Sequence, residues 1–497
     1  MKIALKGPSI SCCSEVFRQT KSVQEQAECI VPDVYEDIGK ITCSQAQLYL
    51  KSKEASDHSV NIGVAADISV FYITERRDRV RCLNFTKNFE IAFDSQTNVS
   101  EGDIRVSLRC MGVQARAINP RKVSAQLSLR AEISCLVDTC SCIPIEAEEA
   151  SGDGLQLRTD VAACVITARP AEKSFVVNEQ IPIDAPEEIT AVSSARVKLL
   201  CGECQTIGSK ALVKGEAELE LACETTEGSC PVFFRESLPF SVLIDKPDEN
   251  CSVGDVLLEA NSLYADMNET INGSRVIEME LHAVAQVSFE KNEQLRFLSD
   301  AYSTVCPVNL EKGSSQLCLS HGKQHLTAAA EEHIQVENER GDPVCVFADI
   351  LSFSVRSGKA EISVSVNLLL RDDEGIYSTQ QRILTAEAVP PECGGDLIGA
   401  SVASINAERS GDEIVLELSL MLDYSCTEFG EINYLTSVEL DSEHPYDLAA
   451  QPSLSIVKTG NRDRWELAKL YHSSVEAIGE LNAKYPLGGE LLLIPRA

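Results

Sequence analysis

The chain has 497 residues, enough for about three domains of ordinary size, and its hydrophobic fraction of 44% argues against disorder. Acidic residues outnumber basic ones by 32 when histidine is counted as neutral. Nucleic acids and anionic lipids need a basic surface, so this charge argues against both as partners and predicts a solvated acidic surface.

The amino-terminal stretch MKIALKGPSISCCSEVF contains Lys2 and Lys6 but no apolar run of the length that an export signal needs. No stretch of the sequence approaches the ~18 consecutive apolar residues of a membrane span. We therefore expect a protein without a transmembrane segment that stays in the cytosol of the cell that makes it. In that reducing compartment, most of the 20 cysteines should be thiols rather than a disulfide framework.

An internal repeat of roughly 150 residues occupies most of the chain. Apolar strand patterns that begin at Val60, Ala211 and Ala360 lie 151 and 149 residues apart. Each is followed by a Gly-Asp pair that opens an alternating strand, and then by a polar turn and a second strong strand. The three pairs are Gly102-Asp103, Gly254-Asp255 and Gly395-Asp396. Similar spacing at separate positions predicts one unit present three times.

Within each unit, apolar and polar residues alternate, as they do from Val276 to Val287, so alternate side chains should face core and solvent. Turn-forming residues such as 119–121 and 410–412 separate the strands. The expected fold class is mainly β. It comprises three tandem antiparallel β-sandwich or barrel-like repeats, arranged like beads on a chain, and a small α+β module with strand–helix–helix–strand order.

The expected domains are residues 1–145, 146–290 and 291–445 for the three repeats, and 446–497 for the terminal module. The acidic, turn-rich segment 140–154 is the expected linker after the first repeat. Residues 441–447 are expected to form a hinge before the terminal module. The third repeat differs from the others because it carries the segment Asp300-Ala-Tyr-Ser-Thr304.

No motif in the sequence indicates catalysis. It lacks a phosphate-binding loop of the Gly-x-x-x-x-Gly-Lys-Ser/Thr type, a Gly-x-Ser-x-Gly elbow and a His-Glu-x-x-His zinc helix. His321, His325 and His333 cluster near Cys318, but no tight ligand spacing supports a metal site. We therefore predict no enzymatic activity, no cofactor and no metal.

The sharpest cysteine motif is Cys201-Gly-Glu-Cys204. Such a pair can supply half of a zinc site or a redox dithiol. A structural zinc site needs a second close pair, however, and Cys223 and Cys230 are seven residues apart. Redox pairs open a helix in a βαβ context, whereas this pair lies among strands. Ordinary reduced thiols are the favoured interpretation, and crosslinking of exposed cysteines after cell lysis is a further hypothesis.

The last fifty or so residues are unlike the rest of the chain. Leu454, Ile456 and Val457 open an apolar strand, and a buried strand at 491–494 closes the chain before Pro495. Between them, apolar residues recur twice at helical spacing: Trp465, Leu467, Ala468 and Tyr471, and then Val475, Ile478 and Leu481. We expect Trp465, the only tryptophan, to pack the two helices on the sheet.

This unit resembles a LysM domain, a small βααβ module best known for binding N-acetylglucosamine polymers. The matching residues are Val457, Gly460, Trp465, Leu467, Ala468, Tyr471, Ile478, Asn482, Gly489, Leu493, Ile494 and Pro495. The loop after Gly460 departs from the family pattern, because it is one residue longer and lacks the usual Asp-Thr-Leu. The resemblance implies a binding groove, for protein or glycan, at Gly460, Asn461, Arg462, Asp463, Arg464, Ile478, Leu481 and Asn482.

Three β-repeats, the segment 300–304 and a terminal LysM-like unit together resemble the SPOCS-domain proteins of spore-forming Firmicutes. The resemblance implies a structural role in spore-envelope assembly. In that family the LysM unit contacts a morphogenetic ATPase that coats the forespore surface inside the mother cell. It implies as partners that ATPase-like protein and other coat proteins, and as location the mother-cell cytosol at the forespore surface.

Two functions remain open after this comparison. The favoured one is a non-enzymatic scaffold whose terminal unit docks on a coat protein. The alternative is binding of peptidoglycan or another N-acetylglucosamine polymer through the same unit. The rewritten loop at 461–464 and the missing export signal favour the scaffold.

Overall fold

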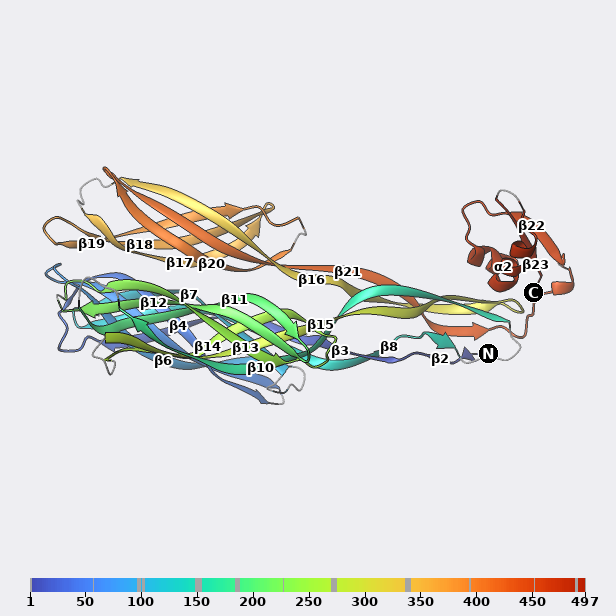
Figure 1. Ribbon diagram of the computed structural model, residues 1–497, viewed down its shortest axis with the longest axis horizontal. Helices are drawn as coiled ribbons and strands as arrows, with labels where there is room; N and C mark the ends of the chain where they lie inside the picture. The colour runs from blue at the N-terminus through green and yellow to red at the C-terminus, as the bar shows by residue number, and fades with distance from the viewer. Residues whose placement is uncertain are drawn as a thin grey trace.

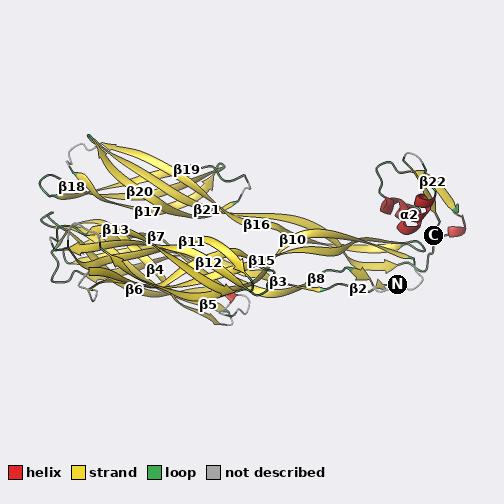
Figure 2. Cartoon of the chain, in the orientation of Figure 1, coloured by secondary structure: helices red, strands yellow, loops and turns green. Residues whose placement is uncertain are grey.

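The chain folds almost entirely into long antiparallel strands, which Figure 2 draws in yellow. The computed structural model describes residues 2–56, 58–95, 100, 103–147, 154–183, 188–226, 228–269, 275–335, 341–392, 395–450, 452–487 and 490–496. Gly102, Gly489 and residues 148–153 of the expected linker lie outside the described residues. The predicted mainly-β fold class is confirmed.

Each repeat is a sandwich of two sheets and contributes three strands to each of them. The strands of the first repeat are β3 (Ser9–Ile30), β4 (Ile38–Ser56), β5 (Ser59–Thr74), β6 (Val80–Asp94), β7 (Ile104–Asn119) and β8 (Lys122–Cys142). One sheet has the order β3-β8-β7 and the other β4-β5-β6. The first strand of the repeat therefore pairs with the last one.

The second and third repeats share this topology. The second contains β10 (Leu155–Pro182), β11 (Ile189–Ile207), β12 (Lys210–Thr225), β13 (Val232–Asp245), β14 (Ser252–Glu269) and β15 (Arg275–Ser303). The third contains β16 (Val308–Gln335), β17 (Asp342–Arg356), β18 (Lys359–Arg371), β19 (Tyr377–Ala388), β20 (Asp396–Ser410) and β21 (Glu413–Leu440). Their sheets are β10-β15-β14 with β11-β12-β13, and β16-β21-β20 with β17-β18-β19. The short strand β1 (Lys2–Ile3) also pairs with β21 and is the fourth strand of its sheet.

Alternation along the strands produces the core of each sandwich. On β8, Val123, Ala125, Leu127 and Leu129 are each at most 1% exposed, because every second side chain points between the sheets. Aliphatic residues of the facing sheet complete that core. The turns predicted at 119–121 and 410–412 fall between paired strands, and Gly411 adopts a positive φ of 65° that glycine tolerates.

The second repeat ends later than the sequence suggested. β15 runs without a break from Arg275 to Ser303, across residue 291 where we expected the third repeat to begin. It pairs with β10 as far as Leu155 and Ser303. Asp300 and Tyr302 therefore lie on the last strand of the second repeat and not in the third.

The repeats lie side by side and do not form the expected string of beads (Figure 1). One phenylalanine from each repeat, namely Phe71, Phe233 and Phe347, contributes to a shared aromatic cluster with ring centroids 5.3–5.7 Å apart. Such tilted and edge-to-face pairs each contribute about 0.5–1.5 kcal/mol beyond burial. The cluster therefore ties the three sandwiches into one body.

Polar side chains also join the first repeat to the second, because they form hydrogen bonds with backbone groups of the edge strand β7. Gln286 accepts from the Val106 N–H at 3.2 Å and donates to its carbonyl at 3.3 Å. Glu259 accepts from the Leu108 N–H at 3.2 Å, and its burial raises its pKa to about 8 despite that hydrogen bond. The Glu259 carboxyl therefore accepts from Leu108 in the same way that the Gln286 amide oxygen accepts from Val106.

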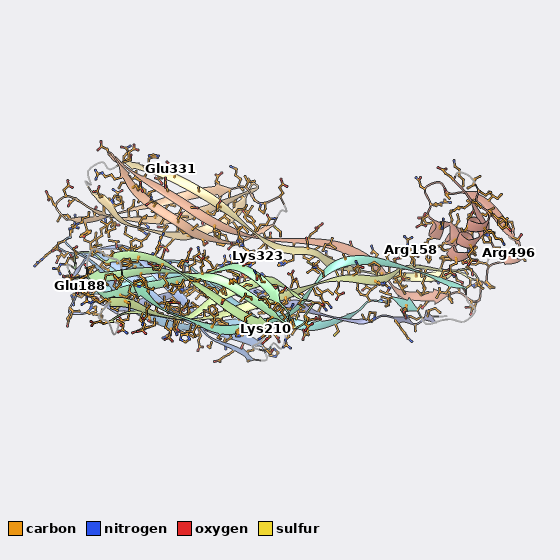
Figure 3. The ribbon with its side chains drawn as sticks, viewed as in Figure 1. Arg158, Glu188, Lys210, Lys323, Glu331 and Arg496 are labelled. Carbon is orange, nitrogen blue, oxygen red and sulfur yellow. The ribbon has the colours of Figure 1, made fainter. Side chains whose placement is uncertain are left out.

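The Gly-Asp positions of the first two repeats make charged links. Asp255 of the second repeat forms ion pairs with Arg105 of the first repeat at 3.3 Å and with Lys323 of the third at 2.5 Å. Asp103 pairs with Arg169 of the second repeat at 3.2 Å. Burial raises the pKa of Asp255, but the two cations outweigh it and hold the pKa below its usual value. Figure 3 labels Lys323 beside the second repeat.

A long stalk extends from the three sandwiches. We define it as residues 155–168, 290–303, 308–322 and 426–440, together with the short strands β1 (Lys2–Ile3), β2 (Leu5–Lys6) and β9 (Glu146–Ala147). Its interior contains its own apolar clusters, with Leu298 and Leu435 fully buried. In Figure 1 the stalk projects to the right and carries the C-terminal module at its end.

Candidate functional site

The C-terminal module has the predicted strand–helix–helix–strand order. It consists of β22 (Leu454–Lys458), α1 (Arg464–Leu470), α2 (Val475–Lys484) and β23 (Leu491–Pro495), preceded by a short 3-10 turn at Leu448–Ala450. β22 and β23 pair antiparallel, with Ile456 opposite Leu493. Figure 2 colours the helices of the module red at the end of the stalk.

Asp463, an expected groove residue, begins helix α1. Its Oδ1 accepts from the Glu466 N–H at 2.7 Å, and Glu466 Oε2 accepts from the Asp463 N–H at 3.3 Å. This reciprocal capping box satisfies donors that the first helical turn leaves unpaired. The Asp-x-x-Glu spacing was a signal in the sequence that pointed to this role.

Two other expected groove residues hold the module together. Ile478 is fully buried in the module core beside Leu467 and Ala468. The Asn482 amide donates to the carbonyls of Ile478 at 2.7 Å and Leu493 at 2.6 Å, and its oxygen accepts from the Leu493 N–H at 2.8 Å. Asn482 therefore clamps α2 to β23, and the fully buried Ile478 is not accessible to a partner.

The remaining expected groove residues lie nearer the surface. Asn461, Arg462 and Arg464 are exposed in the loop before α1 and its first turn, and Leu481 is half-buried on α2. Gly460 makes the turn into this loop with a φ of 55°, a conformation that glycine adopts without strain. An exposed loop with two arginines is the part of the expected groove that remains available for binding.

The module is docked on the stalk through Asp300, the first residue of the segment that sequence analysis singled out. Trp465 Nε1 donates to Asp300 Oδ2 at 2.8 Å, and Lys469 Nζ lies 2.8 Å from both carboxylate oxygens. Burial raises the pKa of Asp300, but the hydrogen bonds from Lys469 and Trp465 outweigh it and leave the pKa below its usual value. The carboxylate is therefore held in its charged form.

Tyr302, two residues further along β15, enters the module itself. Its ring meets Trp465 edge-to-face with centroids 4.8 Å apart. Its hydroxyl donates to the Ser473 carbonyl at 2.8 Å in a buried contact, and burial raises its pKa to about 12. Residues i and i+2 of a strand share one face, so Asp300 and Tyr302 form a single docking surface.

Arg158 extends this surface onto the neighbouring strand. It pairs in register with Asp300 across β10 and β15, and its guanidinium contacts Asp463 at 3.1 Å. Both members of that ion pair are about half exposed, so it contributes little free energy. Figure 3 labels Arg158 on the stalk directly beside the module.

The expected hinge at 441–447 is held against the stalk. Asp441 N–H donates to the Pro307 carbonyl at 2.9 Å, and Tyr446 N–H donates to the Val305 carbonyl at 2.8 Å. Tyr446 then stacks on His472 with ring centroids 3.7 Å apart. These contacts give the module a second attachment besides the docking surface.

Trp465 therefore has a role beyond the packing that we expected. Its ring packs at the edge of the module core, but its hydrogen bond and its aromatic partner both belong to the stalk. No local pattern in the sequence joins residues 165 positions apart, so this contact had no sequence signal.

A pocket of about 250 Å³ lies on the module. Its lining residues include Leu470, Tyr471, His472, Pro495 and Arg496. Burial lowers the pKa of His472. None of the expected groove residues contributes to this pocket.

The charge of the module differs from that of the rest of the chain. Residues 446–497 contain six basic and six acidic side chains, so the excess of 32 acidic residues belongs to residues 1–445. A neutral module at the end of an acidic body approaches an acidic partner with less repulsion than the body would.

The histidines that clustered in the sequence spread along β16. His321 contacts Glu290 at 2.8 Å, His325 contacts Asp423 at 2.7 Å, and His333 contacts Glu331 and Glu413, both at 3.1 Å. Within the described ranges, no group of three or more His, Cys, Asp or Glu residues is arranged to hold a metal ion. The same part of the chain contains no helix both long and apolar enough to span a membrane.

No family model matches the chain, and no curated protein matches it.

Proposed function

We propose that this protein is a non-enzymatic scaffold in spore-envelope assembly, and that its C-terminal module binds a coat morphogenetic partner at the forespore surface. The sequence resemblance supplies the biological setting. The observation that carries the proposal is the fixed presentation of the module at the stalk end, through Asp300 and Tyr302, with its arginine loop exposed.

The three sandwiches suit a spacer or layer-forming body. They share aromatic and polar contacts, so they act as one unit rather than as flexible beads. Their acidic surface resists non-specific association, which an assembly component needs until its specific partner is present.

Arg462 and Arg464 are the residues that we propose contact the partner. Both are exposed, and arginine is enriched at protein interfaces because its planar guanidinium makes several hydrogen bonds at once. An ATPase-like coat protein with an acidic patch would be recognised by this loop. Peptidoglycan binding remains the alternative, since the resemblance to LysM units applies to both.

The test uses the full chain and the double variant Arg462→Glu/Arg464→Glu. Each protein is immobilised and exposed to extract from sporulating cells, and is also sedimented with purified peptidoglycan. We expect the wild-type chain to retain a coat ATPase-like protein and the double variant to lose that binding by on the order of tenfold. Neither protein should sediment with peptidoglycan.

A matched control carries the same charge change far from the module. Arg356→Glu/Lys359→Glu alters two exposed residues flanking the β17–β18 turn and should bind like the wild type. Arginine-dependent sedimentation with peptidoglycan, without capture of a coat protein, would overturn the proposal in favour of glycan binding.

A further inference from the structure

The pair Cys201 and Cys204 converges in space although it lies on a strand. The two Sγ atoms are 3.6 Å apart. They belong to β11, an edge strand of its sheet, where register shifts and bulges are common. We expected ordinary thiols here because the pair lies among strands and not at the start of a helix in a βαβ unit. In a straight strand, residues i and i+3 would also be far apart and point to opposite faces.

A β-bulge removes that separation. Cys201 pairs with Gly215 and Cys204 pairs with Val213, so three steps along β11 match only two steps along β12. Two strand residues span about 6.8 Å and share a face, and disulfides accept Cα separations of up to about 6.8 Å. The backbone is therefore already arranged for both thiols to meet on one side.

The surroundings favour a dithiol over a metal site. Glu203, between the cysteines, is engaged by Gln205 at 2.7 Å and Lys214 at 3.9 Å. Among the described residues, no His, Cys, Asp or Glu side chain lies where it could bind a metal ion together with this pair. Cys201 is exposed and Cys204 partly so, which leaves both sulfurs open to a small reagent.

We propose that Cys201 and Cys204 form a redox-active dithiol, with Cys204 as the attacking thiol and Cys201 as the resolving thiol. This inference does not depend on the proposed function. The oxidant is a small-molecule disulfide. The Cys204 thiolate attacks one sulfur of that disulfide, forms a mixed disulfide and releases one small thiolate.

The second step closes the pair. Cys201 loses its proton and attacks the Cys204 sulfur, which forms the intrastrand disulfide and releases the second small thiolate. The protein loses two protons and two electrons, and the small disulfide is reduced to two thiols. Reduction by excess small thiol reverses both steps.

Either thiol can donate in the 3.6 Å contact, and donation from Cys201 makes Cys204 the attacking thiol. Donation from the Cys201 thiol outweighs the burial of Cys204 and lowers the Cys204 pKa to about 7, whereas the pKa of Cys201 is raised by that hydrogen bond and by burial. Asp255 raises the pKa of both thiols, Glu203 raises that of Cys204, and Lys323 lowers that of Cys201. Near pH 7, Cys204 is thus the more abundant thiolate.

The test uses the full chain with glutathione disulfide at pH 7, followed by alkylation and mass spectrometry of the peptide that contains both cysteines. The wild-type peptide should lose two hydrogens and retain no glutathione. Cys201→Ser should accumulate a glutathione adduct on Cys204, because the resolving thiol is missing. Unchanged near-UV circular dichroism confirms that each variant is folded.

Rates separate an activated dithiol from two ordinary thiols. The hydroxyl of Cys201→Ser can still donate to Cys204, whereas Cys201→Ala cannot. A lower pKa gives Cys204 more thiolate at pH 7 but makes each thiolate less nucleophilic. Together the two effects predict that Cys204 reacts about fivefold faster in Cys201→Ser than in Cys201→Ala. Cys201 in Cys204→Ala should react as slowly as Cys204 in Cys201→Ala.

Two results would overturn the proposal. One is a wild-type peptide that carries two glutathione adducts, or none, without forming the internal disulfide. The other is a Cys204→Ala variant whose Cys201 reacts at least as fast as Cys204 in Cys201→Ser.

Discussion

Trp465 Nε1 donates to the carboxylate of Asp300 at 2.8 Å, which joins the terminal module to a strand 165 residues earlier in the chain. Because Trp465 is the only tryptophan, its fluorescence reports this contact directly. A module fixed in this way keeps its Arg462 loop in a constant orientation relative to the stalk. The orientation of the module on the stalk therefore depends on a few side chains, and each can be replaced in turn.

Replacing Asp300 with asparagine should weaken docking without unfolding either part. The amide can still accept from Trp465 but no longer carries the charge that faces Lys469. Lys469 is 43% exposed, so we expect a loss of only about 1–2 kcal/mol. Tryptophan fluorescence and hydrogen exchange in α1 measure it. Glu293→Gln on the same strand should change neither signal, and equal effects of the two variants would contradict the docking role of Asp300.

Tyr302→Phe tests the buried half of the same surface. It removes the 2.8 Å hydrogen bond to the Ser473 carbonyl but keeps the ring against Trp465. We expect a cost of about 1–2 kcal/mol, because that carbonyl loses its donor in a dry environment. Tyr302→Leu also removes the aromatic contact and should cost about 0.5–1.5 kcal/mol more. Thermal unfolding of the module should rank the wild type above Phe and Phe above Leu, and a reversed order would refute the contact.

Acid should release the module from the stalk. The pKa of Asp300 is lower in the docked state than its ordinary value of 3.8, so docking favours the charged form. Its contribution is complete above pH 3.8 and is lost as pH falls through the lowered pKa. A fluorescence titration of Trp465 should show a transition below pH 3.8 in the wild type. If the same transition persists in Asp300→Asn, another group causes it.

The strands of the repeats could be predicted because the alternation of apolar and polar residues is a local sequence pattern. Alternation at Val123, Ala125 and Leu127 predicts a strand with one buried face, and the burial of all three follows. The packing of the repeats against one another could not be predicted from the sequence, because the contacts between Phe71, Phe233 and Phe347 join residues far apart in the chain.

The expected groove shows the same division. The order of strands and helices follows from apolar spacing, but a family pattern does not separate residues that bind from residues that support the fold. Asn482 matches the pattern through its hydrogen bonds to the backbone, and Asp463 matches a helix cap. Their hydrogen bonds mark Asn482 and Asp463 as structural residues, whereas Arg462 and Arg464 are exposed, and the sequence pattern shows neither property.

Asn482→Ala should destabilise the module itself. Three backbone groups lose their side-chain partner, and unsatisfied buried groups cost about 1–3 kcal/mol each before water or relaxation compensates. We expect about 2–4 kcal/mol in total, enough to unfold so small a unit at moderate temperature. Circular dichroism of the helices and Trp465 fluorescence measure it. Asn461→Ala, in the exposed loop, is the control and should melt like the wild type.

Glu259→Gln should stabilise the junction between the first two repeats in a pH-dependent way. Folding raises the pKa of Glu259 from 4.5 to about 8, so the folded chain takes up a proton and the glutamate costs stability as pH rises through that interval. Glutamine keeps an oxygen for the Leu108 N–H, as Gln286 does for Val106, but does not titrate. Urea midpoints should be similar for wild type and variant at pH 4 and should diverge in favour of the variant towards pH 9, by a free energy on the order of a few kcal/mol. Glu216→Gln, at an exposed position on β12, should show no such divergence. A Glu259→Gln difference that stays constant across this pH range would mean that the buried carboxyl does not take up a proton on folding.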